Sequence, residues 1–384
     1  MKNKRFYIYS ILMLLMIIGV SSCKKAAVTA SDNFLAYTIP NVPVTSNYLV
    51  GAFYYSFSSF SANVTEVPTV GKYDYVNSAP VPVSGVATPP IMQQQIADAD
   101  TAGIDYFIFS VRSPTLDNAN YKQDSLLINT FLAQPTSSTM NFALTYNLNI
   151  GLFGVTNSGG ISGNGVTIET NASKLTSFYN DFKRIAFWMS KSNYQKVNGK
   201  YILVINNAQD LNSNNNVTLY QQIRTNLSAM GFQLYIVGMQ NRWSPPQRYY
   251  YRFQNCTDAM YEANMGDYAG DLDRHNLFPQ MCDQNWAYWK STIESWNMEF
   301  VPCVMAGYNY QINSPTSSNV SVPRTLDGSW YTTFTNVAKR NASKSRLIFL
   351  DSFNNYVLDS QVEPTQFYGN NYLDITRTAF KVAQ

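Results

Sequence analysis

Short apolar runs alternate with amphipathic segments along most of the chain. Eight runs rich in Val, Ile, Phe and Tyr predict strands, at 48–55, 104–111, 141–146, 201–205, 233–237, 257–262, 300–305 and 347–352. Helical patterns fall between most of them, at 93–102, 124–133, 172–191, 219–230, 286–296, 330–340 and 372–382. Strands that alternate with helices in this way favour parallel βαβ units.

The fold that this pattern predicts is an α/β barrel. Eight strand–helix units favour a closed (β/α)8 TIM-type barrel over an open, doubly wound sheet, and 384 residues suffice for one such domain. No G-x-G-x-x-G motif follows the first strand, which weakens a dinucleotide-binding interpretation. The segment 240–254, with Pro245 and Pro246, is expected to be irregular. Asp105, at the start of the second strand, is expected to be structural.

The first residues have the pattern of an export signal. Lys2, Lys4 and Arg5 precede an apolar run at 6–20, which is short for a bilayer span of ~20 residues. The following Val-Ser-Ser-Cys resembles a bacterial lipobox that ends at Cys23. We therefore expect a lipoprotein signal peptide at 1–22, a lipidated Cys23 with a flexible tether at 23–46, and the barrel at 47–384. The protein would then be anchored to the outer membrane of a bacterial cell envelope; an ordinary signal peptide with a coincidental cysteine is the alternative.

Composition narrows the range of partners. The net charge is only +3, so no basic field points to nucleic acid. Aromatic residues make up 15% of the chain, including 28 Tyr and 22 Phe. Aromatic rings can stack on sugar rings, although a tyrosine-rich core would explain the same numbers.

Metal and nucleophile chemistry has little support in the sequence. His275 is the single histidine and is expected to be a solvated surface residue. Cys256, Cys282 and Cys303 form no CxxC pair, so we expect no zinc site, no other metal and no cofactor. Because three is an odd number, at least one of these thiols stays unpaired. A calcium site at Asp267, Asp271 and Asp273 stays open as a weak alternative without an EF-hand pattern.

Several segments, in order, resemble one carbohydrate-active family. They are the segments 51–55, 102–110 (Ala-Gly-Ile-Asp followed by apolar residues), 194–201 (Tyr-x-x-x-x-Gly-Lys), 300–308 and the C-terminal 346–374. Together they are similar to glycoside hydrolase family 99 and the family 71–99-like group, which includes endo-alpha-mannosidases and related bacterial polysaccharide proteins. The resemblance implies a (β/α)8 barrel and a carbohydrate ligand, with mannan as the first candidate.

The acids of that family do not fall on acids here. Its last strand ends in Asn-Glu-Trp-His-Glu, followed by Gly-Thr-Gln-Ile-Glu-Pro. Asn354 matches the Asn, Asn355 takes the place of the first Glu, Tyr356 that of the Trp, and Leu358 that of the second Glu. The family's Glu after its third or fourth strand has no counterpart in 142–147. Losing one general acid costs roughly 10²–10⁴ in rate.

Other carboxylates are candidates to replace them. Glu262 at the end of the sixth strand, paired with Asp351 or Asp359, is the predicted catalytic set. Asp351 is equally explained as part of a polar layer inside the barrel. Glu363 fits the Glu-Pro position and is expected to be structural, capping backbone donors in the final turn.

Aromatic and amide residues near strand ends suit a sugar cleft. The predicted substrate-binding residues are Tyr54, Tyr55, Tyr146, Trp243, Tyr308, Asn354, Asn355, Tyr356 and Gln361. Further candidates at strand ends are Arg112, Asn147, Asn206, Asn207, Gln240, Asn241 and Asn309. Ordinary packing would explain any single one of them equally well.

Two functional hypotheses follow from the retained frame and the missing acids. The first is a cell-envelope lipoprotein that acts on glycans as a glycoside hydrolase with a degenerate or relocated acid/base pair. The second is a non-catalytic polysaccharide-binding lipoprotein that serves glycan uptake, with uptake proteins as partners. A structural envelope protein without a sugar ligand is a third possibility. The sequence leaves open whether the protein is an enzyme.

Overall fold

The computed structural model describes residues 35–56, 63–73, 88–156, 165–241, 243–263, 277–312, 314–317, 321–322 and 324–383. The larger of two compact units, Ile39–Gln384, contains the sheet and the helices. The expected signal peptide, Cys23 and His275 lie outside the described residues. No helix in the described ranges is long and apolar enough to span a bilayer.

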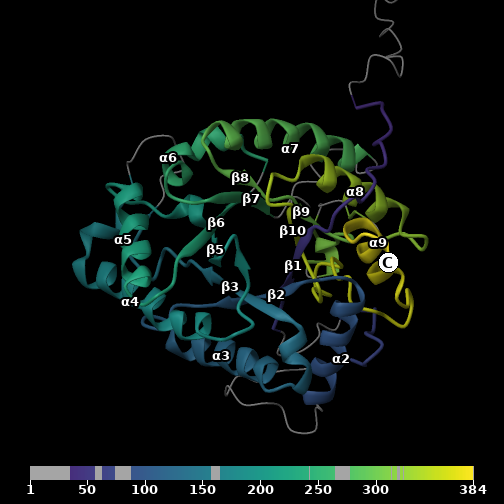
Figure 1. Ribbon diagram of the computed structural model, residues 1–384, viewed down its shortest axis with the longest axis horizontal. Helices are drawn as coiled ribbons and strands as arrows, with labels where there is room; N and C mark the ends of the chain where they lie inside the picture. The colour runs from purple at the N-terminus through teal and green to yellow at the C-terminus, as the bar shows by residue number, and fades with distance from the viewer. Residues whose placement is uncertain are drawn as a thin grey trace, which may run out of the picture. The chain divides into compact units, whose positions relative to one another are not determined.

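A single sheet of parallel strands forms the centre of this unit (Figure 1). Its strands are β1 (Leu49–Tyr54), β2 (Tyr106–Val111), β3 (Asn141–Asn147), β5 (Lys200–Asn206), β6 (Leu234–Asn241), β7 (Ala259–Ala263), β8 (Glu299–Phe300), β9 (Cys303–Val304) and β10 (Leu347–Leu350). The short β4 (Lys196–Val197) pairs antiparallel with β5. The order β8-β7-β6-β5-β3-β2-β1-β10-β9 confirms the predicted parallel α/β fold.

The sheet closes into a barrel at the seventh strand position along the chain, which β8 and β9 share. β8 and β9 are two pieces of this one position, divided by Val301 and Pro302. β8 pairs with β7 and β9 pairs with β10, so the two ends of the strand order belong to the same position. The proline has no N–H to donate, but its carbonyl accepts the Phe349 N–H at 2.9 Å. With β4 set aside and β8 and β9 counted as one, the ten strands occupy eight positions, the number in a TIM barrel.

Helices lie around the outside of the strands (Figure 1). They are α2 (Thr88–Thr101), α3 (Asn118–Leu132), α4 (Ala172–Met189), α5 (Asn216–Ser228), α6 (Tyr250–Phe253), α7 (Phe278–Ser295), α8 (Ser329–Asn341) and α9 (Asn371–Phe380). Three helices begin well before their predicted starts: α2 at Thr88, α3 at Asn118 and α7 at Phe278. α2 and α7 carry proline in the first turn, where the missing N–H costs no hydrogen bond. The segment expected to be irregular instead extends β6 to Asn241 and forms a 3-10 turn (Pro246–Tyr249) before α6.

Alternate residues of the strands fill the barrel interior. The buried cluster takes every second residue, for example Ala259, Tyr261 and Ala263 from β7 and Ile202 and Val204 from β5. Gly51 makes room for one large member, because a Cβ there would lie 2.3 Å from the Tyr106 ring. The side chains between these inward positions face the helices.

An ion pair connects elements at the amino ends of the strands, which we call the lower end of the barrel. Asp105, just before β2, accepts hydrogen bonds from the Val50 N–H at 2.7 Å and from Lys381 Nζ at 2.6 Å. It therefore ties β1 and the segment after α9 to the start of β2, and the expectation that it is structural agrees with these contacts.

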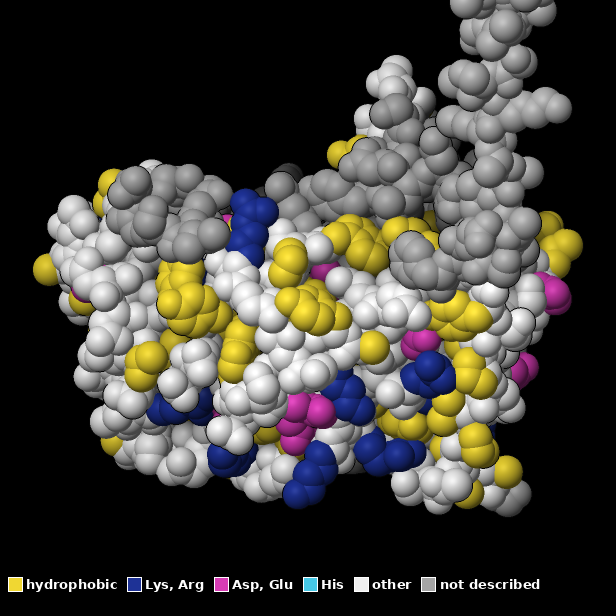
Figure 2. Space-filling view, turned by 90° about the horizontal axis from the view of Figure 1, so that it is seen from above, with side chains coloured by type: hydrophobic (Ala, Val, Ile, Leu, Met, Phe, Trp, Pro, Cys, Tyr) yellow, Lys and Arg dark blue, Asp and Glu magenta, His cyan; other side chains and the backbone are white. Residues whose placement is uncertain are grey.

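On the face in Figure 2, Lys and Arg side chains gather mainly in the lower half of the picture, with Asp and Glu among them.

Candidate functional site

A cavity of about 550 Å³ lies at the carboxyl ends of the strands. Active sites of (β/α)8 barrels lie at this end, and the volume is within the range of small-ligand sites. We call this cavity the mouth pocket. Its lining comes from β1, β2, β3, β5, β6 and β7, from residues that follow some of these strands, from the residue after β10, and from α3: Phe53, Tyr54, Tyr55, Ser56, Ile108, Ser110, Arg112, Gln123, Asp124, Thr145, Asn147, Asn206, Asn207, Met239, Tyr261, Ala263 and Asp351.

The polar lining follows from the alternation of the strands. Each of β1, β2, β3, β5 and β10 places a last apolar residue in the interior cluster or against it: Phe53, which packs against the cluster, and its members Ile108, Ala143, Val204 and Phe349. Two residues further along each strand comes a polar side chain that lines the mouth pocket: Tyr55, Ser110, Thr145, Asn206 and Asp351. The interior therefore changes from apolar to polar at one level of the barrel.

Several polar groups of the mouth pocket make no side-chain hydrogen bond to the described residues. The Thr145 side chain is 4% exposed, and its Oγ1 has no hydrogen-bond partner in the described part of the chain. The side-chain amides of Asn147, Asn206 and Asn207 likewise have no partner among the described residues. Buried polar groups are nearly always satisfied in folded proteins. The buried Thr145 hydroxyl is therefore open to a ligand, and the half-buried amides of Asn147, Asn206 and Asn207 lie beside it on the pocket wall.

Asp351 is one of two carboxylates that line the mouth pocket. Tyr55 Oη donates to Asp351 Oδ1 at 3.1 Å, and the Tyr55 side chain is 36% exposed. Tyr261 completes this corner, and burial, together with the nearby Cys303 and Asp351, raises its pKa well above the usual value. Asp351 is thus held by a phenol at a solvent-accessible position.

Asp124, the other carboxylate on the pocket wall, forms an ion pair with Arg112. Arg112 Nη2 donates to Asp124 Oδ1 at 2.7 Å and Nε donates to Oδ2 at 3.0 Å. The backbone N–H of Arg112 adds a third bond at 2.8 Å. A bidentate pair of this kind neutralises both groups and fixes their geometry, so Asp124 is a poor candidate for proton transfer.

Glu262 lies on the other side of its strand. Its neighbours Tyr261 and Ala263 belong to the interior cluster, so the Glu262 side chain points toward α7, where Asn285 Nδ2 donates to its Oε2 at 2.7 Å. Glu262 is fully buried. Burial raises the pKa of its carboxyl well above the usual value, and hydrogen bonding to Trp286 and Asn285 opposes this shift. The mouth pocket lining does not include Glu262, contrary to its predicted position facing the mouth.

Glu262 and Asp351 do share a second, much smaller cavity. It has a volume of about 10 Å³ and is also lined by Tyr308, Cys303 and Leu358. A space of that size holds at most one water molecule, so no sugar ring fits between the two carboxyls. The predicted catalytic pair therefore does not flank a substrate site in this structure.

Asp359 belongs to an ion-pair cluster outside the mouth pocket. Arg324 Nη1 pairs with Glu66 and, at 3.5 Å, with Asp359 Oδ1. The guanidinium stacks on Tyr368 and Tyr372, 4.3 and 4.4 Å from the ring centroids. Burial raises the pKa of Asp359 to about 6, and Arg324 opposes that shift. In the described part of the chain, Asp359 therefore contacts other protein side chains and does not line the mouth pocket.

Four predicted sugar contacts in the segment after β10 are buried and bonded within the protein. Gln361 Nε2 donates to Glu66 Oε2 at 2.7 Å, and Asn355 Oδ1 accepts the Leu358 N–H at 3.2 Å. Tyr356 is 1% exposed, and Asn354 bonds the backbone of Tyr55. The mouth pocket lining includes none of the four.

Glu363 is buried, as a structural residue should be, but its partners differ from those predicted. Instead of backbone donors, it accepts from two side chains, Gln95 Nε2 at 2.6 Å and Tyr73 Oη at 2.8 Å. Tyr54 Oη in turn donates to Gln95 Oε1 at 2.8 Å. Tyr54 borders the mouth pocket, but its hydroxyl is directed toward α2.

The remaining predicted aromatic contacts also lie away from the mouth pocket lining. Tyr146 Oη donates to Asp181 Oδ2 of α4 at 2.7 Å, because its position in β3 faces outward. The Trp243 ring packs edge-on against Phe278, with centroids 5.7 Å apart. Tyr308 lines the small cavity and not the mouth pocket. Each therefore has a packing role in the described part of the chain.

The described residues offer little support for metal binding or thiol chemistry. Among the described residues no three His, Cys, Asp or Glu side chains gather in a way that could hold a metal ion. Asp267, Asp271 and Asp273 lie outside the described residues. Cys256, Cys282 and Cys303 are buried free thiols.

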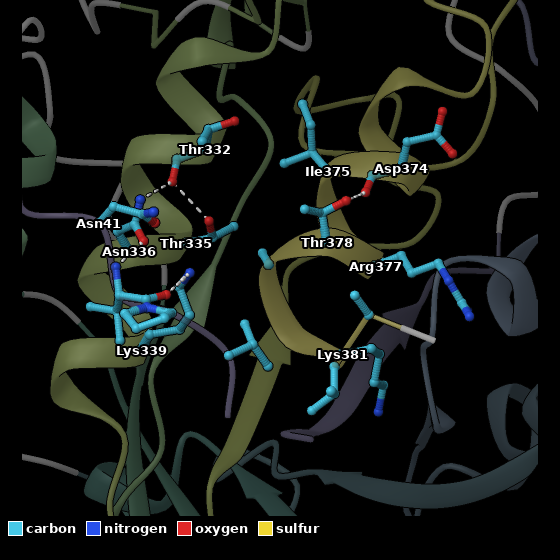
Figure 3. A pocket seen from close by; sticks show the side chains of 16 residues that line it. Asn41, Thr332, Thr335, Asn336, Lys339, Asp374, Ile375, Arg377, Thr378 and Lys381 are labelled. Carbon is cyan, nitrogen blue, oxygen red and sulfur yellow. Dashed lines mark hydrogen bonds between the residues drawn. The ribbon is translucent and has the colours of Figure 1, made fainter. Parts of the chain in front are cut away.

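Another cavity, of about 530 Å³, lies between α8 and α9 (Figure 3). Lys381, which lines it, bonds Asp105 at the lower end of the barrel, opposite the mouth. Its other polar groups serve the chain itself: Lys339 Nζ donates to the Val42 carbonyl at 2.7 Å, and Asn336 Oδ1 accepts the Val42 N–H at 3.0 Å. We therefore place the functional site at the mouth pocket.

Sequence reasoning missed Thr145, Gln123 and Tyr261 as pocket residues. Arg112, Asn147, Asn206 and Asn207 were already candidates because they follow strands. The signal that identifies Thr145 is positional: it lies two residues past Ala143, the last inward apolar residue of β3. That signal requires knowing which face of the strand is inside.

Comparisons with known proteins agree with this architecture. A family model described as "Glycosyltransferase WbsX" matches residues 164–376. A solved structure titled "Glycoside hydrolase-like protein" is 26% identical, with a TM-score of 0.75, and the alignment covers 92% of this chain and 99% of that one. A GH99 endo-alpha-mannosidase from Bacteroides thetaiotaomicron is 14% identical with a TM-score of 0.56, covering 87% and 97%. Among curated proteins no sequence match is found. The predicted resemblance to the family 99 group and the (β/α)8 fold are confirmed.

Proposed function

Because the chain belongs to the WbsX glycosyltransferase family and has a barrel related to that of the GH99 enzymes, we propose that it binds a glycan in the mouth pocket. One observation carries the proposal. Thr145, Asn147, Asn206 and Asn207 present hydroxyl and amide groups that have no partner in the described part of the chain. A sugar ring carries hydroxyls that both donate and accept, which such groups match.

Aromatic side chains supply the other half of a sugar site. Tyr55, Tyr261 and Phe53 line the same cavity as these amides. The faces of sugar rings are apolar and pack on such rings, while the amides fix orientation. Mannan is the first ligand to test, since the GH99 neighbour is an endo-alpha-mannosidase.

The carboxylates of the mouth pocket support binding better than two-acid hydrolysis. Of the two that line it, Asp124 is held by Arg112 and Asp351 is the other. Hydrolysis of a glycoside needs one group to protonate the leaving oxygen and a second to act as base or nucleophile. Within the described lining, Asp351 has no second acid free to act with it.

Hydrolysis centred on Asp351 is the second candidate function. The half-buried Asp351 carboxylate reaches the mouth pocket and accepts from Tyr55 Oη at 3.1 Å. A carboxylate that accepts a hydrogen bond from a phenol at a cavity of this size can serve as a general acid or base. This candidate corresponds to a hydrolase with a relocated acid/base group.

One experiment separates these functions. The purified chain is incubated with a panel of mannans and host glycans, and both product release and gel retardation are measured. Retardation without release supports a binding protein, and release that D351N abolishes supports the hydrolase. Because the Glu262 side chain faces α7, E262Q is expected to leave both readouts unchanged. If the panel is neither retarded nor cleaved, glycan binding is rejected.

A matched pair of variants tests the site itself. N206A removes an amide that lines the mouth pocket, whereas N226A removes one that bonds Gln222 on the surface of α5. N206A is expected to weaken glycan binding about tenfold, the loss of roughly one hydrogen bond. N226A should bind like the wild type. Equal affinities for the two variants would remove the mouth pocket from consideration.

We propose that the protein lies in the cell envelope. Lys2, Lys4, Arg5, the apolar run at 6–20 and Cys23 support export and lipid anchoring at Cys23 to an outer membrane. Glycan binding on such an anchor suits capture for uptake, with uptake proteins as partners.

A further inference from the structure

Asn354 makes an unusual pair of contacts for a side chain. Its Oδ1 accepts the Tyr55 N–H at 2.8 Å, and its Nδ2 donates to the Tyr55 carbonyl at 2.9 Å. The side-chain amide therefore pairs with both polar atoms of one backbone residue, as a neighbouring strand would. Asn354 is fully buried and does not line the mouth pocket.

The orientation of this amide is fixed by a second layer. Asn354 Nδ2 also lies 3.2 Å from Tyr73 Oη, and Tyr73 Oη donates to Glu363 Oε2 at 2.8 Å. A tyrosine hydroxyl has one proton, so Tyr73 can only accept from Asn354. Glu363 is held in turn by Gln95 Nε2 at 2.6 Å. The chain of bonds thus specifies which end of the Asn354 amide faces the Tyr55 carbonyl.

The residue held in this way is one that faces the ligand site. Tyr55 follows the last residue of β1, and its ring lines the mouth pocket. Its hydroxyl donates to Asp351 Oδ1 at 3.1 Å. The two bonds from Asn354 fix the backbone of Tyr55. Because a fixed backbone limits where the side chain can lie, these bonds also position the Tyr55 ring and its hydrogen bond to Asp351.

We propose that Asn354 is a positioning residue that acts through Tyr55, with Tyr73 and Glu363 behind it, and so sets the geometry of the Tyr55–Asp351 pair in the mouth pocket. Its value to glycan binding rests on the proposed function, whereas its effect on Tyr55 does not. Asn354 itself does not line the mouth pocket.

The test follows Tyr55 directly in the ligand-free protein. The chain is produced with 3-fluorotyrosine, and the ¹⁹F resonance of Tyr55 is assigned by its loss in Y55F. N354A removes all three Asn354 side-chain bonds. N354D keeps the size and the acceptor to the Tyr55 N–H but has no donor for the Tyr55 carbonyl or Tyr73. In both variants the Tyr55 resonance is expected to shift.

N341A is the matched control. Asn341 is also a buried asparagine, and its Nδ2 donates to Asp283 Oδ1 at 3.0 Å and to the Val337 carbonyl at 2.8 Å, on α8. Its loss lowers stability without reaching β1, so the Tyr55 resonance stays in place. Mannan binding measured by gel retardation is expected to weaken about tenfold in N354D and to be unchanged in N341A.

Two outcomes overturn the inference. One is a Tyr55 resonance that coincides with the wild type in folded N354A or, if the alanine variant does not fold, in N354D. The other is the same shift in N341A as in N354D, which would show a general loss of stability. A wild-type protein that retards no glycan rejects the proposed function alone, because the fluorine comparison still decides whether Asn354 positions Tyr55.

Discussion

Adjacent residues in the strands have opposite surroundings. In β3, Tyr146 faces outward and bonds Asp181, while Thr145 and Asn147 line the mouth pocket. In β7, Tyr261 lies inside and Glu262 lies against α7. Because side chains alternate along a strand, an offset of one residue moves a group from the ligand site to the helix layer.

Thr145 should show a conflict between stability and binding. Its Oγ1 is buried without a partner among the residues that the structure describes, so T145V removes an unsatisfied hydroxyl at nearly constant volume. We expect the free energy of unfolding to rise by about 1 kcal/mol while glycan affinity falls. Chemical denaturation and gel retardation measure the two effects. The control is T376V, which is expected to destabilise, since Thr376 Oγ1 donates to the Tyr372 carbonyl at 2.7 Å and contacts Tyr331 Oη at 3.0 Å. A T145V variant less stable than wild type would contradict this account.

Glu363 should make stability depend on pH. Burial raises its pKa from 4.5 to about 7, opposed by the bonds from Gln95 and Tyr73. Between these values the folded state binds more protons than the unfolded state, so the free energy of unfolding falls as pH rises. The contribution is complete below about 4.5 and lost above about 7, with a size on the order of 3 kcal/mol. Denaturation of E363Q across this range should show a shallower decline than wild type; parallel curves would rule out Glu363 as the cause.

The elements were the part of the fold most open to prediction. Each predicted strand and helix has a counterpart, because apolar periodicity reports burial on a strand or a helix face. The starts of α2 and α7 were missed because their first turns carry proline and polar residues. The interruption of the seventh strand at Pro302 was not visible either, since a proline near a strand end is compatible with several pairings.

Helix α4 should depend on one buried acid. Asp181 accepts from the Thr115 N–H at 2.9 Å and from the hydroxyls of Ser113, Thr115 and Tyr146, which joins α4 to β3 and to the segment after β2. D181A leaves those donors without a partner and is expected to lower the free energy of unfolding by about 3 kcal/mol or more. D100A, at an exposed position of α2, should change it by less than about 0.5 kcal/mol. Equal denaturation midpoints for the two variants would show that Asp181 does not hold α4.

For the molecule as a whole, closure of the sheet creates the site. The mouth pocket draws on β1, β2, β3, β5, β6, β7 and the residue after β10, which are spread over about 300 residues of sequence and meet only because the ring closes. The family match and the fold relatives belong to this scale, since they describe the barrel rather than any one side chain.

The proposed lipid anchor at Cys23 gives a further prediction. Cells that express the protein are fed an alkyne-tagged fatty acid, and the label on the protein is read after membrane fractionation. The wild type is expected to be labelled and membrane-bound, because acyl chains on Cys23 would hold it in the bilayer. C23A should lose both properties, while C256A, which alters a buried thiol, should keep them. An unlabelled wild-type protein would leave Cys23 as an ordinary residue near a signal peptide.

The sequence by itself determined the class of fold, the number of strand–helix units and the absence of the family's usual acids. These follow from periodicity and residue identity, which are local properties of the chain. Only the tertiary structure decided which carboxylate faces the mouth, since Glu262 and Asp351 both lie near strand ends but on opposite faces. It also decided that Asn354 serves Tyr55, a residue 299 positions away, because such contacts depend on how the closed barrel brings distant strands together.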